Sequence, residues 1–329
     1  MSKALCLLAL LGAVSIPVAA QIAAPPVATP AATVDVDALL TQMTLDEKLG
    51  LLHGTLDPQP TVGLGSAGYL PGVPRLGIPP VRLADGPAGI RTIATATALP
   101  APVMLAASFD RALAQRYGET IGMEGIARNQ HVLLSPMVNL VRVPQAGRNF
   151  ETFGEDPVLA GALVAAEITG IQNEGMMATV KHFAANNQEK DRLTINAEVD
   201  ERTLRELYLP AFEEAVRAGV ASVMCAYNQV NGAFGCENNY LLNEVLRNDW
   251  GFDGFVMTDW WARHSLGALD AGLNMEMPGF THPEYPVDVS FDAPLRAAVQ
   301  NGSIAEAKVD TAVRPLLVQM QRFGLLDAN

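Results

Sequence analysis

The segment GFVMTDWWA, residues 254–262, places a carboxylate directly after a short apolar run and before two tryptophans. Residues 255–257 are typical of a buried strand, and Asp259 falls where that strand would end. Such a carboxylate must be solvated, paired or used in chemistry, because an isolated charge is costly to remove from water. Two interpretations stand on this segment alone. Asp259 is either a catalytic carboxylate or the N-cap of a helix that begins at Trp260.

Other polar side chains also fall at the ends of apolar runs. Lys181 and His182 lie near the end of one run, and Tyr227 lies at the end of another. Polar residues at several strand ends are typical of the C-terminal rim of a (β/α)8 barrel, where that fold keeps its catalytic residues. The pattern therefore favours the catalytic interpretation of Asp259.

The elements that must position these residues are short β-rich runs that alternate with longer helical patterns. Thr44 and Glu47 form a capping box at one helix start. Asp156 precedes a proline at another, and Asp200 can cap a third. This alternation predicts an α/β fold with a parallel sheet, open or closed into a barrel. The expected strands, apolar on both faces, are 131–136, 179–183, 221–227, 254–258 and 273–277.

Two further segments carry charged side chains beside glycines. In GRNFETFGEDP, Arg148 either forms an ion pair with Glu151 or Asp156, or binds sugar hydroxyls and orients a carboxylate. In RLADGPAGIR, Asp85 either initiates a turn or belongs to the site. Both alternatives stay open on the residues alone.

Composition limits the kinds of partner. The chain has 329 residues, 49% of them hydrophobic and 17% charged, which is enough for one large α/β barrel or two ordinary domains. Its formal net charge of −13 disfavours nucleic acid and anionic membranes and favours a neutral substrate. The spacing of its cysteines and five histidines resembles no zinc site, so we expect neither a metal nor a cofactor.

The N-terminus has the features of an exported protein. Residues 1–20 resemble a secretory signal peptide, with Lys3 at the start, a short apolar run and small residues at a cleavage site. Residues 21–34 are expected to be a Pro/Ala-rich tether. We therefore expect a periplasmic or extracellular protein that does not associate with the membrane after signal removal. Export also permits a disulfide between Cys225 and Cys236, the alternative being two buried thiols.

Five segments together resemble the β-glucosidases of glycoside hydrolase family 3, and they occur in that family's order. The resemblance runs from about residue 36 to residue 327. It implies that residues 35–329 form the family's N-terminal (β/α)8 barrel domain. The five segments are RLADGPAGIR, GRNFETFGEDP, KHFAANNQE, SVMCAYNQVNG and GFVMTDWWA.

The resemblance implies a secreted retaining exo-β-glucosidase that removes terminal non-reducing β-D-glucosyl residues. Asp259 would be the nucleophile that forms a covalent glycosyl-enzyme, and Trp260 would be an apolar wall of the sugar pocket. Arg148 and Lys181 would help to keep Asp259 ionised. The residues implied in substrate binding are Asp85, Arg148, Lys181, His182, Met224, Tyr227 and Trp260.

A retaining enzyme also needs a general acid/base about 5–5.5 Å from the nucleophile. In family 3 β-glucosidases this glutamate comes from a second domain, and the chain ends at Asn329, where the linker to that domain would begin. The family's bacterial β-N-acetylglucosaminidases use a His/Asp pair on the loop after the Lys-His strand, but residues 183–203 here contain no histidine. Glu151, Glu155 and Glu189 are conceivable substitutes, and nothing in the sequence singles one out.

Three hypotheses remain open. The chain is a β-glucosidase-type barrel whose second domain is missing, a catalytically impaired sugar-binding fragment, or an enzyme completed by a separate chain that carries the acid/base domain. β-Xylosidase specificity is the alternative to β-glucosidase, because the same segments serve both. The expected partner is a β-linked glucoside or oligosaccharide.

Overall fold

The computed structural model describes residues 34–283 and 289–326. They belong to one compact unit, Ala32–Asn329. The predicted signal peptide, and all of the predicted tether except Val34, lie outside the described residues. In the part of the chain that is described, no helix has the length and apolar character needed to cross a membrane.

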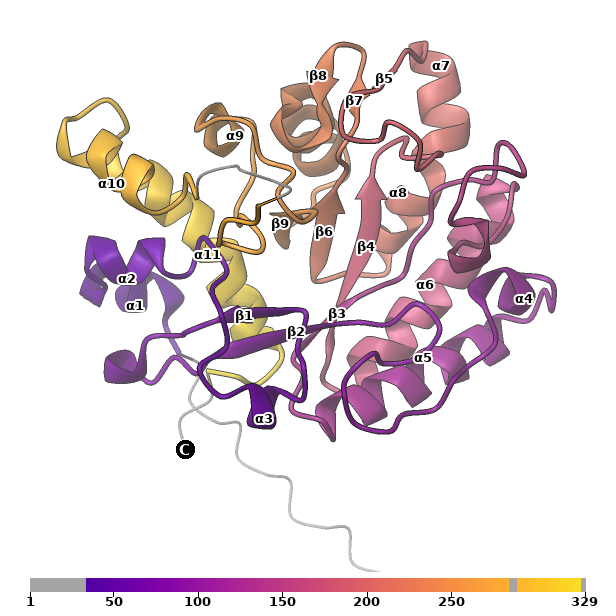
Figure 1. Cartoon of the computed structure of the whole chain (residues 1–329), viewed down its shortest axis with the longest axis horizontal. Helices are drawn as coiled ribbons and strands as arrows, with labels where there is room; N and C mark the ends of the chain where they lie inside the picture. The colour runs from indigo at the N-terminus through magenta and orange to yellow at the C-terminus, as the bar shows by residue number, and fades with distance from the viewer. Residues whose placement is uncertain (1–33, 284–288, 327–329) are drawn as a thin grey trace, which may run out of the picture. The chain divides into compact units, whose positions relative to one another are not determined.

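Six strands form one sheet in the order β1-β2-β3-β4-β6-β9, which lies among the helices in Figure 1. The pairs from β2 to β9 are parallel, whereas β1 is antiparallel to β2. Every residue of these strands except Asp85 is buried, as in a parallel sheet covered on both faces. The strands are β1 (Gly68–Leu70), β2 (Val81–Asp85), β3 (Val132–Leu134), β4 (Met177–Phe183), β6 (Ser222–Cys225) and β9 (Phe255–Thr258).

Two extended segments close the sheet into a barrel. Residues 273–277 pair with β9 in parallel. Residues 52–55 lie between that segment and β1 and hydrogen-bond to both. Gly54 N–H donates to Glu276 O at 2.9 Å on one side, and Thr55 N–H donates to Tyr69 O at 2.9 Å on the other. Eight segments of the described chain thus form a closed ring, which confirms the predicted (β/α)8-type barrel. The barrel differs from one of eight parallel strands in that β1 runs antiparallel to β2.

The helix starts expected from the sequence are present. Thr44 and Glu47 make the capping box of α2. Asp156 accepts the N–H groups of residues 158 and 159 at the start of α6, and Asp200 accepts Thr203 N–H at the start of α7. These caps satisfy N–H groups that have no partner inside the helix.

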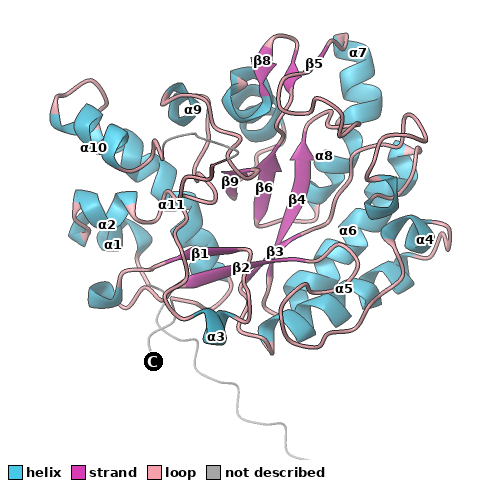
Figure 2. Ribbon diagram, in the orientation of Figure 1, coloured by secondary structure: helices cyan, strands magenta, loops and turns pink. Residues whose placement is uncertain are grey.

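Helices surround the barrel (Figure 2). α5 and α6 pack closely, because a Cβ at Gly118 would lie 2.1 Å from Glu167 O and one at Gly170 would lie 2.1 Å from Gln115 O. Glycine therefore lets the two backbones touch. The α-helices are α1 (Val36–Gln42), α2 (Leu45–Leu49), α3 (Pro60–Gly63), α4 (Pro102–Ala106), α5 (Arg111–Ile126), α6 (Pro157–Asn173), α7 (Glu201–Thr203), α8 (Pro210–Arg217), α9 (Gly267–Asp270), α10 (Ala293–Gln300) and α11 (Glu306–Arg322).

Shorter elements complete the described chain. Three short strands form a second sheet beyond the C-terminal ends of β4 and β6 (Figure 1). They are β5 (Asn196–Ala197), β7 (Gln229–Val230) and β8 (Ala233–Phe234). The 3-10 helices are η1 (Pro74–Leu76), η2 (Asn149–Glu151) and η4 (Gly235–Glu237), and the π-helical segments are η3 (Leu204–Tyr208) and η5 (Tyr240–Asp249).

Candidate active site

The charged and hydroxyl-bearing side chains expected in the site gather at the C-terminal ends of the parallel strands. Asp85 is the last residue of β2, and Asp259 directly follows β9. Lys181 and His182 lie at the end of β4, and Tyr227 lies two residues beyond β6. Because parallel strands end at one rim, the fold brings these side chains together.

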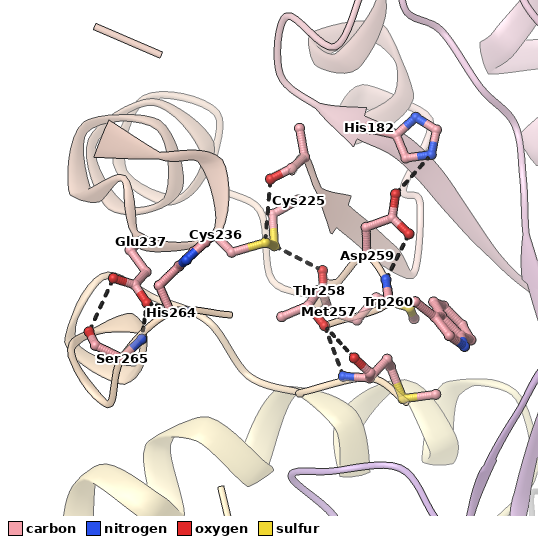
Figure 3. Close-up of a disulfide and its surroundings, with 12 residues drawn as sticks. His182, Cys225, Cys236, Glu237, Met257, Thr258, Asp259, Trp260, His264 and Ser265 are labelled. Atoms are coloured by element: carbon pink, nitrogen blue, oxygen red, sulfur yellow. Dashed lines mark hydrogen bonds and ion pairs between the residues drawn. A yellow bond between two sulfur atoms is a disulfide. The ribbon is translucent and has the colours of Figure 1, made fainter. Parts of the chain in front are cut away.

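The Asp259 carboxylate lies between the main chain of Trp260 and the ring of His182 (Figure 3). Its Oδ1 accepts Trp260 N–H at 2.7 Å, and its Oδ2 lies 3.4 Å from His182 Nε2. Asp259 is only 9% exposed. In the described chain no helix begins at Trp260, and the next one, α9, begins at Gly267. The N-cap interpretation of Asp259 is therefore wrong, and its carboxylate is available for chemistry.

Burial and positive charge act on Asp259 in opposite directions. Removal from water raises the pKa of its carboxyl, while the charges of Lys181 and Arg192 and two hydrogen bonds lower it. Burial is the larger influence, so this pKa lies above that of an ordinary aspartate. The nearby cations therefore offset the burial of Asp259 only in part. Arg192 takes part here although no sequence motif singles it out.

Two consecutive residues of β4 reach the site, although side chains of a regular strand alternate between faces. The pairing of β4 with β6 shifts its register between Lys181 and Phe183. Such irregularities redirect side chains and are common beside active sites. Lys181 Nζ lies 3.9 Å from Asp85 Oδ1, while His182 faces Asp259.

Burial is the largest influence on the pKa of both Lys181 and His182. Burial lowers the pKa of Lys181, and the carboxylates of Asp85 and Asp259 oppose that effect. For His182, burial and then the charges of Arg148 and Lys181 hold the pKa well below its usual range. The His182 imidazole is therefore neutral at pH 7.

Arg148 forms the ion pair with Glu151 that the sequence offered as one interpretation, and its role in binding sugar hydroxyls stays a prediction. Its Nη2 lies 2.6 Å from Glu151 Oε2 and its Nε lies 3.3 Å from Oε1 of the same carboxylate. Its Nη1 lies 3.3 Å from His182 Nε2. The ion pair with Glu151, one of the two partners considered, thus holds the guanidinium in the site.

A pocket of about 480 Å³ opens beside these residues. Asp85, Arg148 and Lys181 line it, and so does Arg91, whose guanidinium pairs with Asp85. Arg91 ends the segment RLADGPAGIR, but its ion pair depends on a loop conformation that the sequence does not reveal. The buried Asp259 is not among the lining residues. The pocket's mixture of donors and acceptors suits a ligand with many hydroxyls.

The remaining expected residues come from β6 and from the turn after β9. Tyr227 hydrogen-bonds to Asp259, and Arg192 Cζ lies 4.5 Å from the centre of the Tyr227 ring. Met224 is buried within β6. Trp260 is half-buried against the apolar core and is not among the residues that line the 480 Å³ pocket. Its role as a sugar-facing wall stays a prediction.

Cys225 and Cys236 form a disulfide that joins the end of β6 to η4 (Figure 3). Glu237, the last residue of η4, accepts the N–H of His264 at 2.9 Å. The disulfide is thus connected to the loop that follows Asp259. Within residues 34–283 and 289–326, no three His, Cys, Asp or Glu side chains are grouped as metal ligands.

Comparison with known proteins gives the family. Residues 72–318 match the N-terminal domain of glycosyl hydrolase family 3. Thermostable β-glucosidase B of Acetivibrio thermocellus is 44% identical over 301 residues, which cover 86% of this chain and 37% of that protein. A β-glucosidase of Rhizobium radiobacter is 40% identical over 300 residues, which cover 89% of this chain and 35% of the relative. The chain thus spans little more than a third of the length of these relatives.

Solved structures give the same result at the level of the fold. DesR, a β-glucosidase from Streptomyces venezuelae solved in complex with D-glucose, superposes with a TM-score of 0.84 at 50% identity, over 91% of this chain and 39% of that one. β-Glucosidase 3B from Thermotoga neapolitana in complex with glucose gives a TM-score of 0.81 at 39% identity, over 89% and 44% of the two chains. The chain therefore belongs to glycosyl hydrolase family 3, and its barrel is the N-terminal domain of that family.

Proposed function

We propose that this chain carries the nucleophile and the sugar-binding subsite of a retaining exo-β-glycosidase of the β-glucosidase type. The observation that carries the proposal is the buried carboxylate of Asp259, which lies at the strand-end rim next to His182 and accepts the main-chain N–H of Trp260. A retaining glycosidase needs such a carboxylate to attack the anomeric carbon and form a covalent glycosyl-enzyme. In this proposal Asp259 makes that bond, and water later breaks it with net retention of configuration.

The surroundings of Asp259 favour a neutral sugar as the substrate. The adjoining pocket combines the carboxylate of Asp85 with the cationic groups of Arg148 and Lys181, a set that can bind hydroxyls both as donors and as acceptors. The relatives from Streptomyces venezuelae and Thermotoga neapolitana were solved with glucose. We therefore take a terminal β-D-glucosyl residue as the substrate and a β-xyloside as the alternative to be tested.

The general acid/base is proposed to come from outside the described residues. Glu151 is engaged by Arg148 at 2.6 Å, and Glu189 is engaged by Arg192 at 2.5 Å. A carboxylate held by an arginine is not free to approach a leaving-group oxygen. Glu155 is exposed in the segment before α6. A second domain or a separate chain is the proposed source of this group.

Export is part of the same proposal. It is supported by the signal-peptide features of residues 1–20. The substrate would then meet the enzyme in the periplasm or outside the cell.

The release of dinitrophenolate from 2,4-dinitrophenyl β-D-glucoside tests the proposed function, because this leaving group needs no proton donor. The full chain should release it, and should do so faster from the glucoside than from the matching β-xyloside. Asp259→Asn should lower the rate by about a thousandfold or more. Asp253→Asn, at an exposed aspartate before β9, is the matched control. An unchanged release rate in Asp259→Asn would refute the assignment of Asp259 as the nucleophile. Faster release from the β-xyloside than from the β-glucoside would show that the chain prefers xylosides.

A further inference from the structure

Asn139, in the loop after β3, clamps the main chain of His182. It is only 4% exposed. Its Nδ2 donates to His182 O at 2.9 Å, and its Oδ1 accepts His182 N–H at 2.9 Å. If the amide were rotated by 180°, its NH2 group would face His182 N–H and its oxygen would face His182 O. The two main-chain bonds therefore determine which end of the Asn139 amide is the oxygen.

The orientation of Asn139 in turn determines where His182 carries its proton. Asn139 Oδ1 also lies 3.1 Å from His182 Nδ1. An amide oxygen can only accept a hydrogen bond, so Nδ1 must be the nitrogen that donates. A neutral imidazole has one N–H, which leaves Nε2 as a bare acceptor. Double protonation of the ring is disfavoured by burial and by the charges of Arg148 and Lys181.

We propose that Asn139 is a positioning residue that locks His182 as the Nδ1–H tautomer and makes Nε2 a hydrogen-bond acceptor in the site. Nε2 lies 3.3 Å from Arg148 Nη1 and 3.4 Å from Asp259 Oδ2. It accepts an N–H of Arg148 and has no proton to give to Asp259. The tautomer follows from these hydrogen bonds, whereas its consequence for sugar binding rests on the proposed function.

The locked tautomer has a consequence for the orientation of Arg148. Two hydrogen bonds to Glu151 and one to His182 Nε2 hold the three nitrogens of the guanidinium. The plane of the Arg148 side chain is therefore set from both sides, and Asn139 acts on it through His182. A sugar hydroxyl that reaches Nε2 must donate its own proton, because Nε2 can only accept.

The same tautomer excludes His182 as the general acid. The nitrogen that faces the nucleophile, Nε2, carries no proton, and the proton on Nδ1 is held by Asn139 on the other side of the ring. Neither nitrogen can therefore protonate the leaving group, which departs from the face of the sugar opposite to Asp259. The contact between His182 and Asp259 thus differs from a catalytic His/Asp pair.

Long-range ¹H–¹⁵N correlation spectra of the full chain labelled with ¹⁵N-histidine test the tautomer directly. A protonated ring nitrogen and a bare one give well-separated signals, and among the five histidines those of His182 are identified by their loss in His182→Gln. We expect a protonated Nδ1 and a bare Nε2, unchanged from about pH 5 to about pH 8. A protonated Nε2, or titration of the ring within that range, would overturn the proposal.

Asn139→Leu tests whether Asn139 is the cause. Without the amide oxygen Nδ1 loses its acceptor, so part of the population should move its proton to Nε2, next to Asp259 Oδ2, although the N–H of Arg148 opposes that shift. Asn149→Ala is the matched control, because the Asn149 amide donates to the main-chain carbonyls of Val143 and Pro144 rather than to His182. An unchanged tautomer in folded Asn139→Leu would refute the positioning role.

If Asn139→Leu does not fold, Asn139→Asp tests the same contact between residue 139 and the His182 ring. Asn139→Asp retains the acceptor at Nδ1 and adds a negative charge, so His182 should keep its Nδ1 proton and gain the second one at a higher pH than in the wild type. If His182 titrates in Asn139→Asp as it does in the wild type, the contact between Asn139 Oδ1 and His182 Nδ1 is refuted. Calorimetric binding of glucose by the same samples separates the two proposals. The expected tautomer in a chain that binds no glucose would refute the proposed function alone.

Discussion

At the scale of single residues, the proposed role of Asp259 requires an ionised carboxylate, and the residues around Asp259 set the pH at which it ionises. Burial raises the pKa of its carboxyl and the charge of Lys181 lowers it. Because burial prevails, part of the Asp259 population is protonated at a pH where an exposed aspartate is fully ionised. Nucleophilic attack should therefore strengthen with rising pH, with a midpoint above the ordinary value of 3.8.

Replacement of Lys181 by methionine should move that midpoint to still higher pH. The substitution removes a positive charge that favours the ionised form of Asp259, while a buried side chain of similar length remains. The rate of covalent labelling by a dinitrophenyl 2-deoxy-2-fluoro-β-glucoside, measured across pH, gives the midpoint. Lys190→Met, at an exposed lysine in the loop after β4, is the control. A midpoint that stays in place or falls would contradict the role of Lys181.

Asp85→Ala should weaken glucose binding without unfolding the barrel. Asp85 lies on the pocket wall, next to Arg91 and 3.9 Å from Lys181, so its loss removes an acceptor and leaves two cations without their partner. A hydrogen bond to a charged group is worth about 1.5–3 kcal/mol, which is roughly a tenfold to hundredfold loss of affinity by titration calorimetry. Asp37→Ala, which breaks an exposed ion pair on α1, is the control. Unchanged affinity would remove Asp85 from the site.

At the scale of elements, local patterns were predictable and distant pairings were not. The expected strands 131–136, 179–183, 221–227 and 254–258 correspond to β3, β4, β6 and β9, because each is an apolar run with its own boundaries. The expected strand 273–277 is present only as an extended segment. β1 is three residues long, and its antiparallel pairing depends on chain reversal rather than on composition. The register shift in β4 likewise leaves no mark on sequence periodicity.

The contact between α5 and α6 contains an unusual buried group. Glu167 is fully buried on α6, and neither of its carboxylate oxygens has a hydrogen-bond partner among the described residues. Burial raises the pKa of Glu167 from 4.5 to about 8. The folded protein therefore holds a proton there that the unfolded chain releases above pH 4.5. The stability that depends on this proton is fully present below pH 4.5 and is lost as the pH rises through about 8.

Glu167→Gln should remove this pH dependence, since the amide is neutral at every pH. The free energy of unfolding of the variant, relative to wild type, should rise by roughly 3–5 kcal/mol between about pH 5 and about pH 9. Urea unfolding at the two pH values measures it. Glu174→Gln, at an exposed carboxylate just beyond the same helix, should give no such change. Equal stability differences at both pH values would show that Glu167 is ionised in the folded state.

At the scale of the whole molecule, the closed ring of strands collects side chains that are far apart in the sequence. Asp85 and Asp259 are separated by more than half of the chain, yet both lie on the C-terminal rim. Their place at this rim could be predicted because each comes at the end of an apolar run. Arg91, Asn139 and Arg192 could not be identified in this way, because their contributions depend on partners supplied by other loops.

The proposed function requires Asp259 to be the nucleophile, and covalent trapping identifies the residue that forms the glycosyl-enzyme. A dinitrophenyl 2-deoxy-2-fluoro-β-glucoside loses its leaving group without a proton donor, while the fluorine slows hydrolysis of the glycosyl-enzyme. Peptide mass spectrometry of the full chain should locate one fluoroglucosyl group on Asp259, and Asp259→Asn should remain unlabelled. A label on another residue, or no label on a chain that binds glucose, would contradict the assignment.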